Sequence, residues 1–182
     1  MLELNFNPFP VIETDRLLLR RVTNDDANAV FELRSNPESM KFIPRPLLKN
    51  TKEALELIAE IDSKIETNIG INWAITLKDN PKLLGIIGYY RTQPENYRSE
   101  IGYILLPEFH GKGIVSEALN RLIKYGFEDL KLHSIEAIID PENFASEKVL
   151  QKCGFIKEAH FKESDYYGGR FRDKVIYSLL EK

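Results

Sequence analysis

Two glycines and a lysine separate an apolar run from a long amphipathic segment, and this junction constrains the fold more than any other stretch. The apolar run is IGYILL, residues 101–106, and the junction reads PEFHGKGIVS, residues 107–116. Apolar residues then recur at helical spacing to about Leu130. The pattern predicts a strand, a glycine loop and a helix in immediate succession, so the loop itself needs an explanation.

Hydrophobic periodicity predicts the elements on the N-terminal side of this junction. A Leu-rich run at 13–20 favours a strand, and two amphipathic helices follow, one capped within 23–26 and one at 50–51, with a proline-interrupted connection at 35–46 between them. Three runs rich in β-branched and aromatic residues then predict an antiparallel meander at 71–77, 83–91 and 98–106.

The C-terminal part continues with a different alternation. After the helix that ends at about Leu130, the pattern predicts a strand at 134–139, a helix at 143–152 stopped by Gly154, and a terminal hairpin at 155–163 and 172–180. The whole order is strand, two helices, three strands, helix, strand, helix and two strands. This order predicts an α+β fold, and 182 residues suit one domain over 1–182.

Composition excludes several classes of function. No stretch approaches the roughly 18 consecutive apolar residues of a membrane span, and the N-terminus lacks a signal-peptide pattern, so we expect a soluble, cytoplasmic protein. A net charge of -3 gives no general attraction to nucleic acid or to anionic membranes. The single cysteine, Cys153, cannot form an internal disulfide, and no Cys/His cluster has zinc spacing, so we expect no metal.

Three explanations of the glycine loop follow from the residues themselves. Gly111 and Gly113 could be turn residues only. Gly111-x-Gly113-x-x-Ser116, followed by Asp140, also matches part of a dinucleotide fingerprint, but its third glycine is absent and the spacing to Asp140 is long. The third explanation is a diphosphate site, in which amides at the positive end of a helix and the charge of Lys112 bind the anion.

Four further segments read, in order along the chain, ETDRLLLRRVTNDDA, SEIGYILLP, NFASEKVLQKCGF and YYGGRFRDKVIYSLL, and the loop itself contains HGKGIV. The four segments resemble the GCN5-related N-acetyltransferase (GNAT) family, in the RimJ/RimL-like branch that includes ribosomal-protein N-terminal acetyltransferases, and HGKGIV resembles the family's pyrophosphate loop. The resemblance implies a mixed, mostly antiparallel, twisted sheet of about seven strands with four helices. It also implies a V-shaped splay between the two central strands and acetyl-CoA as co-substrate.

The resemblance also implies which residues bind acetyl-CoA. Backbone amides of the strand before the loop would hold the pantetheine arm, the loop would hold the diphosphate, and the last helix would contribute side chains. The expected cofactor-binding residues are Ile104, Leu105, Leu106, His110, Gly111, Lys112, Gly113, Ile114, Val115, Ser116, Asn143 and Lys148. His110 and Val115 depart from the family pattern, which has Gln or Arg at the first position and a small residue at the second.

Two residues are candidates for the catalytic roles. Glu100 is the candidate base, because apolar neighbours on a central strand would raise its pKa; alternatively it pairs with Arg91 or Arg98 across the sheet. Ser146 is the candidate acid, although it could equally be a helix-capping residue. The tyrosine that many family members use as the acid is replaced by Leu150.

The resemblance implies fewer residues for the acceptor-binding side. The resemblance places it between the two early helices and the loop at 166–169, with Phe42, Trp73 and Tyr90 as candidate substrate-binding residues that could equally belong to the core. We expect direct acetyl transfer to a primary amine, with a protein N-terminal α-amine as the favoured acceptor. Small amines (amino acids, polyamines or aminoglycosides) are the alternative acceptors, a non-catalytic CoA-binding module is the alternative function, and a homodimer is left open.

Overall fold

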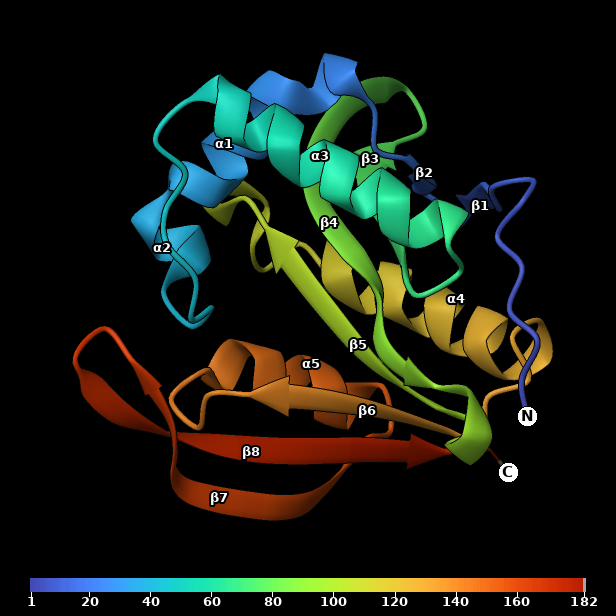
Figure 1. The fold of residues 1–182 in the computed structure, drawn as a ribbon, viewed down its shortest axis with the longest axis vertical. Helices are drawn as coiled ribbons and strands as arrows, with labels where there is room; N and C mark the ends of the chain where they lie inside the picture. The colour runs from blue at the N-terminus through green and yellow to red at the C-terminus, as the bar shows by residue number, and fades with distance from the viewer. Residues whose placement is uncertain (182) are drawn as a thin grey trace.

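The computed structural model describes residues 1–181 and is built on one sheet of eight strands (Figure 1). The strand order is β1-β2-β3-β4-β5-β6-β8-β7, and every neighbouring pair is antiparallel except β5 and β6. The strands are β1 (Ile12–Glu13), β2 (Leu17–Arg21), β3 (Ile71–Leu77), β4 (Asn80–Gln93), β5 (Arg98–Leu105), β6 (Ser134–Ile139), β7 (Ile156–Tyr167) and β8 (Arg170–Leu180). The predicted α+β class and mostly antiparallel sheet are confirmed.

Five α-helices cover the two faces of this sheet in the described residues. They are α1 (Ala27–Ser35), α2 (Pro37–Met40), α3 (Thr51–Glu66), α4 (Ile114–Glu128) and α5 (Phe144–Lys152). Figure 1 shows α1 and α3 in front of the sheet and α4 and α5 behind it. None of the helices within 1–181 is both long and apolar enough to cross a membrane.

Two short elements were not expected from the sequence. The strand β1 adds two residues beside β2, and β2 begins at Leu17 because a turn closes between the Thr14 N–H and the Leu17 C=O, 3.0 Å apart. The connection at 35–46 contains α2, whose first turn is capped by the Asn36 side chain with Pro37 at the first helical position. The sheet therefore has eight strands rather than about seven, and residues 1–181 contain five α-helices rather than four.

The predicted splay lies between β5 and β6. These parallel strands pair at only three positions, and the last is Glu100 opposite Glu136. Beyond it, residues 101–105 of β5 keep their pairing with β4, while residues 137–139 of β6 keep theirs with β8. The two halves of the sheet therefore separate in a V that opens toward the glycine loop (Figure 1).

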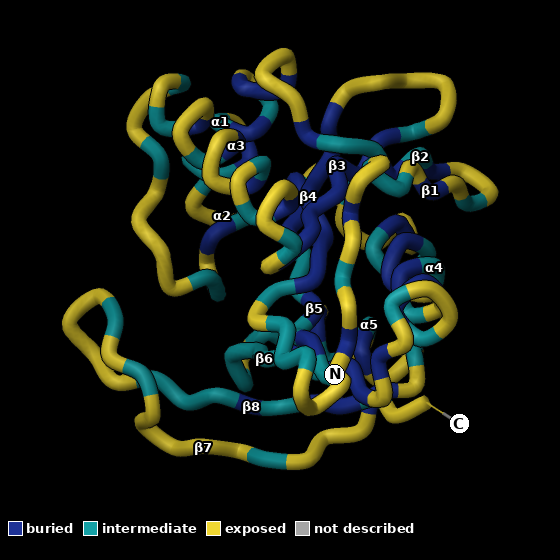
Figure 2. Tube along the Cα trace, turned by 45° about the vertical axis from the view of Figure 1, so that its right-hand side comes forward, coloured by how far each residue is buried: buried dark blue, intermediate teal, exposed yellow. Residues whose placement is uncertain are grey.

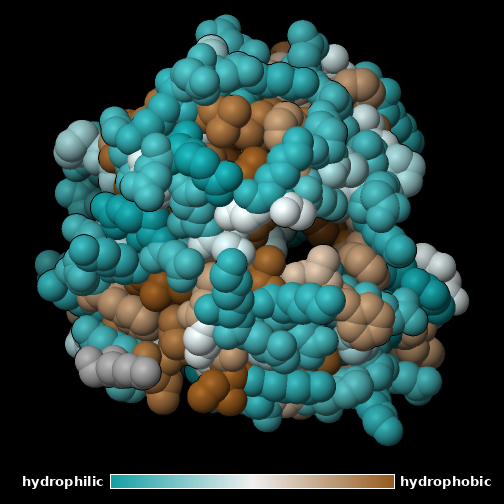
Figure 3. All heavy atoms as spheres, turned by 180° about the vertical axis from the view of Figure 1, so that it is seen from behind, coloured by the Kyte–Doolittle hydropathy of each residue, from teal (hydrophilic) through white to brown (hydrophobic). Residues whose placement is uncertain are grey.

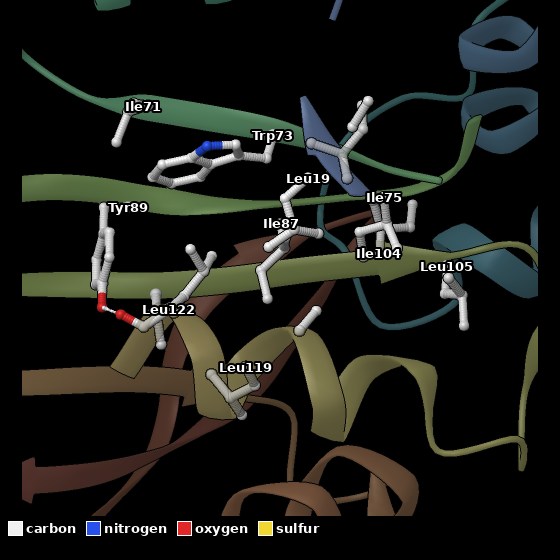
Figure 4. Close-up of a cluster of buried hydrophobic side chains, with 14 of the residues drawn as sticks. Leu19, Ile71, Trp73, Ile75, Ile87, Tyr89, Ile104, Leu105, Leu119 and Leu122 are labelled. Carbon is white, nitrogen blue, oxygen red and sulfur yellow. Dashed lines mark hydrogen bonds between the residues drawn. The ribbon is translucent and has the colours of Figure 1, made fainter. Parts of the chain in front are cut away.

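The core lies on both faces of the sheet, and Figure 4 shows the part between β3, β4 and β5 and the helix α4. Trp73 and Tyr89 are both almost fully buried; the Trp73 ring meets Tyr125 of α4 edge-on at 5.5 Å, and the Tyr89 hydroxyl donates to the Leu122 C=O at 2.7 Å. Because side chains alternate along a strand, Tyr90 must face the opposite side, toward α1 and α3. The sheet thus separates an α4–α5 face from an α1–α3 face.

The terminal hairpin of β7 and β8 forms the edge of the sheet opposite to β1. It turns at Gly168 and Gly169, whose φ angles of 62° and 80° suit a tight two-residue connection. Both strands are longer than the sequence predicted, and β7 is exposed along most of its length (Figure 2). This edge therefore contributes little to the core, whereas β3 and the middle of β4 are buried.

Candidate active site

A cavity of about 330 Å³ lies at the open end of the V. Its walls come from four segments that are distant in sequence: α2 with the following turn, the end of β5, the glycine loop with the start of α4, and the first turns of α5. Figure 3 shows the molecule from behind, with a hollow near the middle of this face and apolar atoms at its edge. The sheet splay and the glycine loop therefore open into the same space.

Most of the sequence-predicted site residues line this cavity. Those that do are Phe42, Ile104, Leu105, His110, Gly111, Gly113, Ile114, Val115, Asn143 and Ser146. Those that do not are Trp73, Tyr90, Glu100, Leu106, Lys112, Ser116 and Lys148. The structure thus gathers the predicted donor side and separates it from much of the predicted acceptor side.

The glycine loop presents a row of free amides. Gly111 and Gly113 have φ angles of 72° and 74°, in the left-handed region that favours glycine, and α4 begins directly after them. The first backbone bond of the helix joins the Glu117 N–H to the Gly113 C=O, and the six consecutive N–H groups of residues 111–116 have no acceptor within residues 1–181. These amides, at the positive end of a helix of 15 residues, fit a diphosphate.

A side-chain network that sequence reasoning missed fixes this loop to the sheet. Glu117 in the first turn of α4 accepts hydrogen bonds from the Thr14 hydroxyl, the Arg16 N–H and the Arg16 guanidinium, the last at 2.7 Å. Arg16 also donates to the Lys112 C=O at 3.1 Å. Burial alone would raise the pKa of Glu117, but these hydrogen bonds hold it below its ordinary value. The only hint of this network in the sequence was the segment ETDR, whose polar residues Thr14 and Arg16 precede β2.

The two predicted lysines and Ser116 lie at the rim rather than in the wall. The Lys112 ammonium lies 5.2 Å from the centroid of the Phe109 ring, and Lys148 is exposed on α5. Ser116 belongs to the first turn of α4 and contributes its free N–H. The two lysines thus add positive charge at the rim, and Ser116 adds one further backbone amide.

The backbone of β5 corrects the expected amide contacts. The Leu106 N–H donates to the Leu84 C=O at 2.9 Å, and the hydrogen-bonded residues of an antiparallel pair alternate, so Ile104 also directs its backbone groups toward β4. The backbone groups of Tyr103 and Leu105 point to the open side instead. The amides available for a ligand in the V are therefore those of Tyr103 and Leu105, not those of Ile104 and Leu106.

His110 supports the end of this strand. Its Nε2 lies 3.0 Å from the Leu105 C=O, and a carbonyl can only accept, so Nε2 carries the hydrogen. The side chain thus connects the loop to β5 while also lining the cavity. This contact gives His110 a positioning role for the loop.

A tyrosine that the sequence reasoning did not select lies against the candidate acid. The Tyr103 hydroxyl and the buried Ser146 Oγ are 2.7 Å apart, and both residues line the cavity. Burial raises the pKa of the Tyr103 phenol, and its hydrogen bond with Ser146 lowers it in part. Leu150, at the position of the expected tyrosine, is completely buried. The cavity therefore contains a hydrogen-bonded pair of hydroxyls, although Leu150 supplies no phenol.

Asn143 caps α5 and also lines the cavity. Its Oδ1 accepts from the Ser146 N–H at 3.1 Å and so caps α5, while the residue also lines the cavity. Since Oδ1 makes this bond, the side-chain amide NH₂ is the group left to meet a ligand. Asn143 thereby positions Ser146 as well.

Glu100 lies at the apex of the V, on the opposite face of β5 from Tyr103. Burial raises the pKa of its carboxyl above the ordinary 4.5, and the Arg91 guanidinium, 2.7 Å away, offsets part of that rise. The side chain of Arg91 is 69% exposed, so its attraction is weakened by water, whereas that of Glu100 is 15% exposed. The structure thus shows both features expected from the sequence, a buried carboxylate and a cross-strand pair with Arg91.

The three aromatic residues predicted for the acceptor side have different surroundings. Phe42 lines the cavity, next to α2. Tyr90 faces α1 and α3, and its hydroxyl accepts from the Asn72 side chain at 2.6 Å. Trp73 is completely buried on the α4 face, and its indole N–H donates to the Pro10 C=O at 2.7 Å. Trp73 therefore belongs to the core, because strand alternation turns it away from the α1–α3 face.

No group of three or more His, Cys, Asp or Glu side chains within residues 1–181 could hold a metal ion. The single cysteine, Cys153, does not line the cavity, and burial raises the pKa of its thiol. A buried thiol with a raised pKa is a poor nucleophile, because the thiolate is the reactive form.

The model of the acetyltransferase (GNAT) domain matches residues 16–156, which include the loop, the V and the cavity. The chain belongs to the GNAT acetyltransferase family. It is 34% identical over 173 residues to the N-acetyltransferase YoaA of Bacillus subtilis, covering 95% of this chain and 98% of that one. A GNAT-family acetyltransferase structure from Bacillus anthracis superposes with a TM-score of 0.84 at 31% identity, covering 94% and 98% of the two chains. The chain is accordingly an N-acetyltransferase.

Relatives with named acceptors differ among themselves. The ribosomal-protein-serine acetyltransferase of Escherichia coli is 31% identical over 99 residues, which is 54% of this chain and 55% of that one. The spermidine N(1)-acetyltransferase of Vibrio cholerae is 27% identical over 170 residues, 92% and 95% of the two chains. The fold is also that of the microcin C7 self-immunity acetyltransferase MccE, solved with acetyl-CoA and AMP, at a TM-score of 0.84 and 23% identity over 92% and 94% of the two chains.

Proposed function

We propose that this N-acetyltransferase transfers the acetyl group of acetyl-CoA directly to a primary amine, and that a protein N-terminal α-amine is the favoured acceptor. The observation that carries the proposal is the cavity in which six free loop amides and the open edge of β5 meet the Tyr103–Ser146 pair. Bound there, acetyl-CoA supplies an acetyl thioester. The loop amides of 111–116 would hold its diphosphate, and the amides of Tyr103 and Leu105 would face its pantetheine arm and thioester carbonyl.

The two proton transfers fall to opposite faces of β5. Glu100 would accept a proton from the acceptor's ammonium on the α1–α3 face and leave a neutral amine to attack, since the raised pKa of Glu100 brings it closer to the pKa of an amine. The Tyr103 hydroxyl would give a proton to the leaving thiolate on the α4–α5 face, and Ser146 would share that proton. Base and acid on opposite sides of one strand suit an acceptor and a donor that enter from opposite faces, and no covalent enzyme intermediate is needed.

The preference for an α-amine rests on its ionisation and on one relative. An α-amine with a pKa near 8 is about 10% neutral at pH 7, whereas a lysine side chain is only about 0.04% neutral. A single base therefore has to deprotonate a smaller fraction of an α-amine than of a lysine side chain. The similarity to the ribosomal-protein-serine acetyltransferase supports this acceptor class, while the similarity to the spermidine N(1)-acetyltransferase supports small amines as the second candidate. A cytoplasmic location is part of the same proposal.

Release of free CoA, measured with a thiol reagent, tests the proposal on a panel of peptides with free N-termini, amino acids and polyamines. Mass spectrometry of each reaction shows whether the acceptor has gained an acetyl group. We expect turnover with peptides and a product acetylated at the α-amine. Tight binding of acetyl-CoA without turnover above hydrolysis would instead support a non-catalytic CoA-binding module.

A further inference from the structure

Within residues 1–181, three buried side-chain nitrogen or oxygen atoms have no hydrogen-bond partner, and two of them lie in adjacent helices, the second of which lines the cavity. These two are Nε of Arg34, in the last turn of α1, and Oγ of Ser39, in α2. Leaving a buried donor unpaired costs about 1–3 kcal/mol. The two groups lie in adjacent helices and have hydrogen-bonding capacity to offer a ligand.

The surroundings of Arg34 hold an excess of positive charge. The nearest side-chain partner of its guanidinium is the Met40 sulfur at 3.7 Å, and neither Arg34 nor Arg45 has a carboxylate within 4.0 Å in the described chain. Burial and then repulsion from Arg45 lower the pKa of Arg34, against the attraction of Tyr90 and Glu60. An arginine nevertheless keeps its charge at neutral pH.

Two nearby carboxylates are already engaged, whereas Glu38, next to Ser39 on α2, lines the cavity and is exposed to solvent. Glu60, on α3, accepts from the Lys64 ammonium at 2.5 Å, and Glu100 accepts from Arg91 at 2.7 Å. The charges of Arg34 and Arg45 are thus not neutralised by a carboxylate in contact with them. A guanidinium can donate two parallel hydrogen bonds to a carboxylate or a phosphate, so these groups are its best partners.

These cations lie on the acceptor side of β5. The sulfur that Arg34 contacts belongs to α2, whose Ser39 lines the cavity. The Tyr90 side chain lies opposite Glu100 across β4 and β5, and its ring covers Gly102, where a β-carbon would lie 3.1 Å from it. Since β5 leaves β6 directly after Glu100, the cations, the candidate base and the opening of the V share one face.

We propose that Arg34 and Arg45, together with the Ser39 hydroxyl, bind an anionic group that the acceptor carries near its amine. This inference rests on the proposed acetyl transfer and narrows its acceptor class. The anion is a carboxylate or a phosphate, and polyamines and aminoglycosides, which carry several positive charges, are repelled. The acceptor is therefore an acidic peptide N-terminus or a small amine that bears an acidic group.

Matched acceptors test the inference with the wild-type protein. Three peptides begin with serine and differ only at the second residue, which is aspartate, asparagine or lysine, so that the α-amine is kept constant. Free serine and 2-aminoethyl phosphate distinguish a free carboxylate and a phosphate from a peptide side chain, and spermidine represents the polycations. We expect kcat/KM for the aspartate peptide to exceed that for the asparagine peptide by roughly tenfold or more, with the lysine peptide and spermidine lowest.

Variants then assign the preference to residues. In Arg34→Gln and in Arg45→Gln, the ratio of kcat/KM between the aspartate and asparagine peptides should fall most of the way to one, because KM for the aspartate peptide rises. Arg34→Lys should retain part of the ratio. Lys41→Gln removes a charge from the same exposed segment, where the lysine lies over the Phe42 ring, and should keep the ratio. Binding of CoA by calorimetry shows that each variant is folded; because Arg45 is exposed, its variant serves if Arg34→Gln does not fold.

The outcomes separate this inference from the proposed function. Equal rates with the three peptides, a preference for spermidine, or an unchanged peptide ratio in both arginine variants would overturn the anion site while leaving acetyl transfer intact. Failure to acetylate any acceptor, with CoA still bound, would overturn the proposed function and this inference with it.

Discussion

The two faces of β5 offer a ligand different kinds of group. The face toward α4 and α5 offers the free backbone amides of the glycine loop and two hydroxyls, Tyr103 and Ser146, that are hydrogen-bonded to each other. The face toward α1 and α3 offers charged side chains, Glu100 with its raised pKa and the unpaired Arg34. A donor that every member of a family shares can be bound by backbone, whereas an acceptor that differs between members has to be selected by side chains.

The largest expected effect comes from the charged face. Glu100→Gln should lower kcat by roughly 10²- to 10⁴-fold without weakening CoA binding, because it removes the base alone. A buried carboxyl with a raised pKa costs folding free energy once pH exceeds the ordinary 4.5, and this cost is complete above the raised pKa. At pH 7 the thermal midpoint of Glu100→Gln should therefore not fall. Steady-state kinetics and thermal melts check both parts.

The pH profile sharpens the same assignment. For the wild type, kcat/KM should rise with pH as Glu100 loses its proton, and Arg91→Gln should move this limb to higher pH because it removes the cation that lowers the pKa of Glu100. Glu100→Gln should lose the limb altogether. A profile of Arg91→Gln identical to that of the wild type would contradict Glu100 as the base.

The next effect comes from the hydroxyl pair on the other face. Tyr103→Phe and Ser146→Ala should each lower kcat by about 10- to 100-fold, less than the base variant, because a thiolate with a pKa near 8.5 leaves without full protonation. If the two hydroxyls share one proton, the double variant should be no slower than the worse single variant. Multiplicative losses measured in the four-enzyme cycle would show that they act separately.

A smaller effect is expected at the glycine loop. Gly113→Ala should weaken CoA binding by about tenfold, because holding alanine at a φ of 74° costs about 1–2 kcal/mol or shifts the loop amides. Crowding is not the cause, since the nearest atom to an added β-carbon is the Arg16 Nη2 at 3.6 Å. Gly169→Ala is the matched control: its φ is 80° in an open turn, so stability should fall while CoA affinity, measured by calorimetry, stays the same.

The smallest effect is expected for the carboxylate that ties down this loop. Glu117→Gln should weaken CoA binding by about two- to fivefold, the range of a partly exposed ion pair. Because the pKa of Glu117 is held below 4.5, its contribution to stability is present above pH 4.5 and is lost as pH falls through the lowered value. Denaturation of both proteins from pH 7 to pH 3 should show the difference closing, and Glu128→Gln, an exposed pair on α4, should show almost none.

The donor side could be predicted from sequence because its signals are local. Gly111 and Gly113 are required by their own backbone angles, and Asn143 caps the helix it begins, so neighbours in sequence were enough to find them. The separation of β5 from β6 followed only from the family resemblance. The amide assignment at Ile104 and Leu106 went to the wrong residues, because the direction of each N–H depends on the register with β4.

The acceptor side could not be predicted in the same way. Trp73 and Tyr90 are both aromatic residues on central strands, yet their positions relative to Tyr89 of β4 put one under α4 and the other toward α1. No local sequence pattern shows on which face of the sheet each of these two side chains lies. Arg34 and Ser39 were not selected at all, since a helix arginine and a helix serine usually face water and become notable only when burial leaves them without partners.

The sequence by itself determined the α+β order and the family that the loop and four further segments resemble, and it made the glycine loop a candidate diphosphate site. The tertiary structure decided which hydroxyl lies against Ser146, which amides of β5 are free, and which charges gather beside Glu100. The physical reason is the range of the interactions involved. Glycine conformation, helix capping and free amides at a helix start depend on a few consecutive residues, whereas pairing and burial depend on contacts between residues far apart in the chain.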